Sequence, residues 1–316
     1  MPGRQRGLAE EFSAFATLNR LQATVGYNAA MVALAVGIGV LIATEAPSMG
    51  PMVSAGLYAT GAVLLKLHAS IADAIHDRAA DAVNPEKSVV AMALTVIGAE
   101  RAWTLLVVEL VVGMTAVGAA AMHTTGWLLI AGATVAICGF TYSYPPRIKE
   151  RGLWNHVVTT GVDVGLLVVP VAAIVGGGVN ATVVVIASVV ACYSFGYHVM
   201  HQTADTHYDR LGGLRTFATA VGVGNAVAVA AGATAVATGL AVALGYPSAV
   251  LVTGGITAYY VWLYCAVVGR STREACVILS QSFSIAWIAS LLNGVLAVAV
   301  WWRVVGRPVV PTALLG

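Results

Sequence analysis

The chain has 316 residues, of which 59% are hydrophobic and only 9% are charged, and its mean hydropathy is +0.86. Soluble domains carry about 25% charged residues, so the composition excludes an ordinary soluble domain and indicates a polytopic membrane protein. The net charge of +2 is spread along the chain without a basic patch, and we expect no nucleic-acid partner.

The apolar runs of the chain predict nine membrane-spanning helices, since a span needs about 20 mainly apolar residues. The runs end at charged residues and at glycine or proline turns. They lie near 22–44, 52–74, 98–121, 126–144, 154–176, 180–204, 216–244, 248–268 and 279–302. We therefore expect an all-α integral membrane protein with one domain over 1–316, including a short N-terminal segment at 1–15 and a short tail at 306–316.

The basic residues are distributed asymmetrically between the two sides of these spans. One side holds the N-terminus and every second loop, with Arg4, Arg6, Arg20, Arg78, Lys87, Arg101, Arg147, Lys149, Arg151, Arg210, Arg215, Arg270 and Arg273. The other side holds Arg303 and Arg307, while Lys66 falls inside the second span. Because basic loops stay in the cytoplasm, we expect the N-terminus and the first side to be cytoplasmic in a cell membrane.

Two sets of aspartates end apolar spans on that side: Asp73, Asp77 and Asp81, and later Asp205 and Asp209. Residues four apart share one face of a helix, where like charges repel by about 0.2–0.5 kcal/mol per pair. A bound divalent cation offsets this repulsion. Carboxylates that share substrate phosphates with a metal are typical of Mg²⁺ sites. Solvated acidic helix ends or structural ion pairs are the alternative interpretation.

Basic residues near these aspartates favour an anionic substrate. Lys66 lies two helical turns before Asp73, Arg215 follows Asp209 by six residues, and Lys149 lies in the charged loop after the fourth span. Carboxylates, Mg²⁺ and basic side chains together describe a diphosphate site, in which the positive groups stabilise the charge that grows as a C–O bond breaks. Its position beside apolar spans points to a lipid diphosphate.

Three segments of the chain resemble motifs of the UbiA-type membrane prenyltransferase superfamily, which also includes intramembrane terpene synthases. The second aspartate set reads DTHYDRLGGLRT from Asp205 to Thr216 and is similar to the family pattern DxxxD followed by GxKT. The first set, DAIHDRAAD, has Asp73 where the family usually has Asn. The segment YSYPPRIK, from Tyr142 to Lys149, resembles the family element YSxPPxxxK. The resemblance covers about residues 15–305.

This resemblance implies a UbiA-like fold of nine helices around a central cavity, with Mg²⁺ as cofactor. It assigns catalytic and metal-binding roles to Asp73, Asp77, Asp205 and Asp209, with Asp81 as a further metal ligand. It assigns diphosphate contacts to Lys66, Tyr142, Lys149 and Arg215.

Aromatic and histidine side chains precede the second aspartate set at four-residue steps. We interpret Tyr193, Tyr197 and His201 as cavity residues that stabilise a carbocation, since aromatic rings attract cations by about 0.5–2 kcal/mol; ordinary helix packing is an equally open interpretation for the tyrosines. Asp163 and Glu109 lie deep in apolar sequence, where acids usually face the protein interior. Either acid could orient an acceptor or be protonated and hydrogen-bonded within the bundle, and we expect a structural rather than a catalytic role.

The expected function is Mg²⁺-dependent ionisation of an isoprenyl diphosphate within the bilayer, followed by transfer of the prenyl group to a lipophilic acceptor and release of diphosphate. One alternative is a terpene synthase, which cyclises the same cation without an acceptor. A more distant alternative is an ion-coupled transporter, although transporters place their charges near the membrane midplane.

Overall fold

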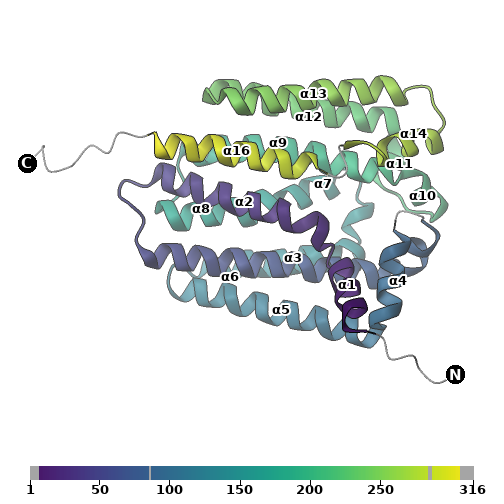
Figure 1. Cartoon of the computed structure of the whole chain (residues 1–316), viewed down its shortest axis with the longest axis horizontal. Coiled ribbons are helices and arrows are strands. Elements are labelled where there is room, and N and C mark those ends of the chain that lie inside the picture. The colour runs from purple at the N-terminus through teal and green to yellow at the C-terminus, as the bar shows by residue number, and fades with distance from the viewer. Residues whose placement is uncertain (1–6, 85–86, 284–286, 307–316) are drawn as a thin grey trace, which may run out of the picture.

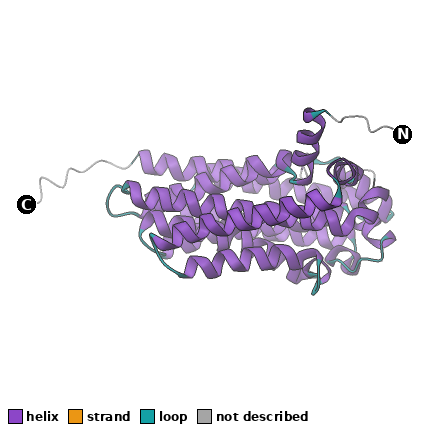
Figure 2. Cartoon of the chain, turned by 90° about the horizontal axis from the view of Figure 1, so that it is seen from below, coloured by secondary structure: helices purple, strands orange, loops and turns teal. Residues whose placement is uncertain are grey.

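The computed structural model describes residues 7–84, 87–283 and 287–306, and every regular element in these ranges is a helix (Figures 1 and 2). The first six residues of the predicted N-terminal segment and all but the first residue of the predicted tail at 306–316 lie outside the described residues. Arg4, Arg6 and Arg307 are among them. The helices are α1 Leu8–Leu18, α2 Leu21–Ile42, α3 Met49–Val83, α4 Ser88–Ile97, α5 Ala99–Met122, α6 Trp127–Ser143, η1 Ile148–Glu150, α7 Leu153–Thr160, η2 Gly161–Val168, α8 Val169–Gly176, α9 Ala181–Ala204, α10 Thr206–Leu211, α11 Phe217–Val221, α12 Val223–Leu244, α13 Pro247–Val267, α14 Thr272–Ser280 and α16 Ile288–Val305.

The described residues contain eight helical segments that are long and apolar enough to cross a membrane, and the 17-residue α6 is a shorter apolar helix. Because spans of about 17 residues can cross a bilayer, α6 completes the set of nine predicted spans. The α7–η2–α8 segment forms one of these spans, from Leu153 to Gly176. The protein is therefore an all-helical, multi-pass membrane protein.

The predicted spans differ from the structure mainly at the charged side of the bundle. Helix α3 continues to Val83, beyond the predicted end at 74, and carries all three aspartates of the first set. The predicted span at 216–244 is two helices, because Gly222 takes a left-handed φ of 85° between α11 and α12. The predicted span at 279–302 is displaced: α14 ends at Ser280, and the spanning helix α16 starts at Ile288.

The long helices lie side by side, and the short helices gather at one end of the bundle. Figure 1 shows α1, α4, α10, α11 and α14 together at the right-hand end, where α3 and α9 also finish. Helix α9 packs on α12, α12 on α13, α2 on α16, and α3 on α5 and α6. The two aspartate sets, on α3 and at the α9–α10 junction, therefore share one end of the bundle.

Small residues allow the closest helix contacts. A Cβ atom added to Gly61 on α3 would lie 2.6 Å from the backbone oxygen of Gly113 on α5, so no larger side chain fits there. In a membrane, where lipid tails are as apolar as leucine, such close backbone approach is a main source of helix association. This packing fixes α3 and the functional side chains at its end.

Candidate active site

One cavity of about 340 Å³ extends from the ends of α3 and α9 into the bundle. Its wall includes apolar side chains of α3, α6 and the α7–η2 segment, among them Leu65, Val135, Val158 and Val162. Four of the five predicted aspartates line it, Asp73, Asp77, Asp205 and Asp209, and we call this part of the cavity the aspartate end. Two segments that are more than 120 residues apart thus present carboxylates to a single space.

The carboxylates of the first set are held by two basic side chains, Arg20 and Lys149, and by one hydroxyl group. Asp73 accepts from the Arg20 guanidinium and from the Ser143 hydroxyl, each at 2.6 Å. The Lys149 ammonium donates to Asp77 and lies 3.4 Å from Asp73. Lys149 is only 5% exposed, because the 3₁₀ turn η1 after the two prolines brings it under the end of α3.

The second set is held by a turn at the end of α9. Asp205 is the last residue before α10 and forms an ion pair of 2.8 Å with Lys87. Asp209 follows one turn later, and Gly213, with a φ of 71°, reverses the chain so that Thr216 also lines the cavity. Tyr142, Tyr197 and His201 are further predicted residues that line this cavity.

The charges at the aspartate end are unevenly matched. Arg20, Lys87 and Lys149 face four carboxylates, and Asp209 forms no ion pair with a described residue. Burial, and then the neighbouring Asp205, raise the pKa of Asp209 to about 6. Burial alone would lower the pKa of Lys87, but the Asp205 carboxylate reverses this and raises it. The site therefore holds uncompensated negative charge.

A second polar group lies deeper in the same cavity, and we call it the Asp163 cluster: Tyr27, Lys66, Asp163 and His198. Asp163 is 4% exposed, and its carboxylate pairs with the Lys66 ammonium at 2.6 Å and accepts from the Tyr27 hydroxyl. His198 Nε2 lies 3.0 Å from the same carboxylate. Lys66 precedes Asp73 by seven residues and His198 precedes Asp205 by seven, so the cluster lies about 10 Å deeper along both helices.

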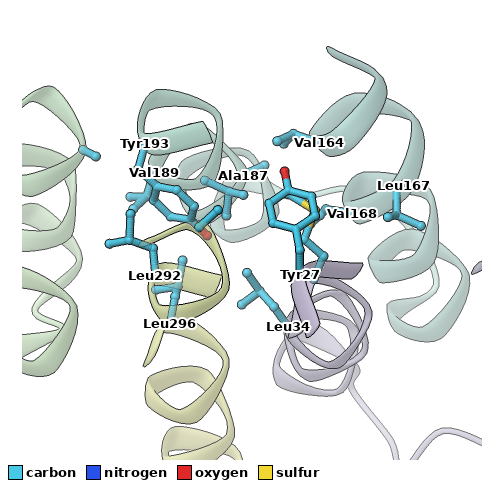
Figure 3. Packing of buried hydrophobic residues seen from close by; sticks show 14 of the residues in the cluster. Tyr27, Leu34, Val164, Leu167, Val168, Ala187, Val189, Tyr193, Leu292 and Leu296 are labelled. Carbon is cyan, nitrogen blue, oxygen red and sulfur yellow. The ribbon is translucent and has the colours of Figure 1, made fainter. Parts of the chain in front are cut away.

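Three predicted site residues do not line the cavity. Asp81 is buried behind it at the end of α3, and burial raises its pKa to about 6. Arg215 is exposed, because the turn at Gly213 directs it outward. Tyr193 faces α16, where its hydroxyl donates to Asn293, and Figure 3 shows its ring beside Val189 and Leu292. The structure places none of these three side chains on the cavity wall, and their predicted roles in metal binding, diphosphate binding and cation stabilisation stay predictions.

Lys66, a predicted diphosphate ligand, lines the cavity, but its ammonium is directed away from the aspartate end. Its ammonium is taken by Asp163 and by the Asn28 amide oxygen, 2.6 Å away. The sequence analysis also missed Arg20 and Lys87 as partners of the aspartates. Both are basic residues on the predicted cytoplasmic side, and this shared position was the sequence signal that could have identified them as partners of the aspartates.

The chain was compared with protein families and with solved structures. Residues 29–291 match the model of the UbiA prenyltransferase family. The chain belongs to this family. No curated protein sequence matches it. A UbiA homologue from Archaeoglobus fulgidus bound to GPP and Mg²⁺ has 15% identity and a TM-score of 0.62, with 92% of this chain and 99% of that chain covered.

Two further structures have the same fold. The same homologue bound to DMAPP and Mg²⁺ has 15% identity and a TM-score of 0.62, with coverage of 93% and 99%. A structure of digeranylgeranylglyceryl phosphate synthase has 12% identity and a TM-score of 0.59, with coverage of 94% and 100%. The protein is thus a UbiA-family enzyme with the family's fold over nearly its whole length, and its aspartate end is the candidate active site.

Proposed function

We propose that this chain is a Mg²⁺-dependent prenyltransferase that ionises an isoprenyl diphosphate and transfers the prenyl group to an acceptor. The observation that carries the proposal is the shared cavity, in which four aspartates from two distant segments meet basic side chains at one end of an apolar space. The diphosphate head of an isoprenyl diphosphate matches the charged aspartate end, and its prenyl chain matches the apolar part of the cavity. The related structures with GPP or DMAPP and Mg²⁺ support the same assignment.

The donor set fits a hard divalent cation. Carboxylate oxygens are its preferred ligands, and Asp77, Asp205 and Asp209 are the residues that would hold it, with Asp73 beside them. Among the described residues no three acidic, histidine or cysteine groups already lie close enough to form a metal site. The carboxylates are engaged by Arg20, Lys87 and Lys149, so metal binding exchanges some of these ion pairs. When bound, Mg²⁺ supplies positive charge to the leaving diphosphate.

The chain's own residues bind and orient the substrate. Lys149, with Arg20 and Lys87, contacts the diphosphate oxygens and stabilises the charge that develops as the C–O bond breaks. Tyr142 lines the same end, and Tyr197 presents its ring to the space beyond. Tyr197 and His201 shield the allylic cation from water, with the attraction between an aromatic face and a positive charge as the source of stabilisation.

We further propose that the aspartate end faces the cytoplasm of a cell membrane. Apart from Lys66 within α3 and Arg303 at the opposite end, the described basic residues belong to the segments at this end of the bundle, while the opposite turns are short and almost uncharged. The isoprenyl diphosphate then enters with its charged head from water and its chain from the bilayer.

A direct assay tests the function. The full chain, purified into lipid nanodiscs, is given geranyl diphosphate and Mg²⁺, with and without lipophilic acceptors, and both diphosphate and organic products are measured. We expect diphosphate release that EDTA abolishes and a prenylated acceptor. Release that is independent of divalent metal would overturn the metal assignment, and a cyclised hydrocarbon formed without acceptor would overturn the transfer.

A further inference from the structure

The Asp163 cluster is a charged group inside the membrane-spanning part of the protein. Charged side chains there are costly, and they usually mark functional positions. Asp163 is paired with Lys66, and Lys66 lies 5.0 Å from the centre of the Tyr27 ring. The cluster combines residues of α2, α3, η2 and α9, and all four line the cavity. A bundle stabilised by packing alone has no need for this arrangement.

The backbone is also unusual at this point. Asp163 lies in η2, an eight-residue π-helical segment between α7 and α8. π-Helical turns are rare and occur frequently at functional sites. Figure 3 shows the Tyr27 hydroxyl pointing toward this segment near Val164. The local helix geometry and the buried ion pair are two independent indications that the position of Asp163 serves the reaction.

His198 has one occupied and one available ring nitrogen. A carboxylate only accepts hydrogen bonds, so Nε2, which lies 3.0 Å from Asp163, carries the proton. Nδ1 is then the basic nitrogen, and none of the hydrogen bonds among the described residues involves it. His198 lines the cavity, which places a base oriented by a carboxylate on the wall of the space that holds the prenyl chain.

The geometry points to His198 as the base that removes the proton of an acceptor hydroxyl, with Asp163 as its positioning residue and Lys66 stabilising the oxygen. This inference rests on the proposed function and names the class of acceptor, an alcohol or phenol. His198 Nδ1 can accept the proton of a hydroxyl group, and the Lys66 ammonium can stabilise the negative charge that then develops on the hydroxyl oxygen. The cluster lies about 10 Å beyond the aspartates along both helices, which leaves room for diphosphate on one side and the acceptor on the other.

The bond between prenyl C1 and the diphosphate oxygen breaks, and diphosphate leaves with the electron pair. The acceptor oxygen gives an electron pair to C1 and forms the C–O bond of a prenyl ether. The hydroxyl proton moves to His198 Nδ1, and the resulting imidazolium is stabilised by the Asp163 carboxylate.

The test measures how the enzyme partitions its cation between an alcohol and water. Nanodiscs holding the full chain receive geranyl diphosphate, Mg²⁺, and either 4-butylphenol or 1-decanol as probe. The readout is the ratio of geranyl ether to total diphosphate released. His198→Gln keeps a polar side chain but removes the base, Asp163→Asn removes the orienting charge, and His123→Gln, at the exposed turn after α5, is the matched control.

We expect the unaltered chain to form ether from at least one probe. The ratio of ether to released diphosphate should fall by about 100-fold in His198→Gln and by less in Asp163→Asn. The ratio should not change in the control His123→Gln. Added imidazole should restore the ratio in His198→Ala, which a purely structural role would not allow. An unchanged ratio in His198→Gln, no recovery with imidazole, or diphosphate release without ether from either probe would each overturn the inference. Absence of Mg²⁺-dependent diphosphate release in the unaltered chain would instead overturn the proposed function.

Discussion

The aspartate end and the Asp163 cluster both hold buried carboxylates in one cavity, but their charges are balanced differently. At the aspartate end four carboxylates meet Arg20, Lys87 and Lys149, and Asp209 is left without an ion pair among the described residues. In the Asp163 cluster one carboxylate meets one ammonium, with Tyr27 and His198 as further partners. An unbalanced group needs a cation from solution, whereas a balanced one can orient a neutral molecule. The difference in charge balance is the reason why we propose metal binding at the aspartate end and acceptor binding at the Asp163 cluster.

The largest expected effect is at the aspartate end. Asp77→Ala and Asp209→Ala should each lower diphosphate release by about 1,000-fold or more, because each removes metal-binding charge at the breaking bond. Release from geranyl diphosphate at saturating Mg²⁺ is the measurement. Near-normal turnover in either variant would refute the metal site.

Lys149 and Arg215 give a matched pair of basic residues. Lys149→Met should reduce diphosphate release by about 100-fold, because its buried ammonium lies between Asp73 and Asp77. Arg215→Met should stay within about twofold, because Arg215 is exposed and does not line the cavity. If both variants lost activity equally, the placement of Arg215 outside the site would be wrong.

Asp73 differs from its neighbours because it has the most partners of the four carboxylates at the aspartate end. Arg20, Ser143 and Lys149 all contact it. Asp73→Asn keeps hydrogen bonds to the first two and should lower turnover by about tenfold, well short of the loss in Asp77→Ala. Parallel rate measurements at several Mg²⁺ concentrations distinguish weaker metal binding from slower chemistry. A loss as large as that of Asp77→Ala would make Asp73 an equal metal ligand.

The unbalanced charge should also be visible in stability. The pKa of Asp209 in the folded protein is about 6, above its ordinary value of about 3.9. Stability from this group is therefore complete below pH about 4 and lost as pH rises through about 6. Because the side chain is partly exposed, we expect a loss of about 1 kcal/mol, near 2–4 °C in Tm.

The comparison protein for this measurement is Asp209→Asn. Without metal, it should be more stable than the unaltered chain at pH 7.5 and equally stable at pH 4.5, by thermal unfolding in the same nanodiscs. Equal stability at both values would show that the Asp209 charge is compensated after all.

The smallest effect is expected for Tyr193, the aromatic residue outside the cavity. Tyr193→Phe removes a buried hydrogen bond to Asn293 and should cost about 1 kcal/mol of stability. Diphosphate release and product distribution should remain within about twofold of the unaltered chain. A changed product distribution would show that the Tyr193 side chain affects the substrate cavity.

Local spacing in the sequence was sufficient to predict the aspartate end. Asp73 and Asp77 are four residues apart and share a helical face, and the same interval separates Asp205 from Asp209. The length of the apolar runs located the spans that carry both sets. The basic asymmetry then placed both sets on the same side. These are properties of single helices or of topology, and they do not require knowledge of which helices are neighbours.

The Asp163 cluster was not predictable in the same way. Its hydrogen bond between Tyr27 and Asp163 joins residues 136 positions apart, and no spacing rule indicates that α2 and η2 meet. Asp163 was noticed as an acid in apolar sequence, but its role depends on partners from three other helices. Arg215 and Tyr193 were misplaced for a related reason: a glycine turn and the position of α16 decide where these side chains point.

The π-helical segment η2 has a consequence for how this span responds to a deletion. A π turn contains about one residue more than an α turn, so it is equivalent to a one-residue insertion absorbed without a loop. Deleting one residue between Gly161 and Val168 would return the segment to α geometry and rotate Asp163 by about 100° relative to α8. We therefore expect a single-codon deletion here to move the Asp163 carboxylate away from the cavity while leaving the membrane span intact.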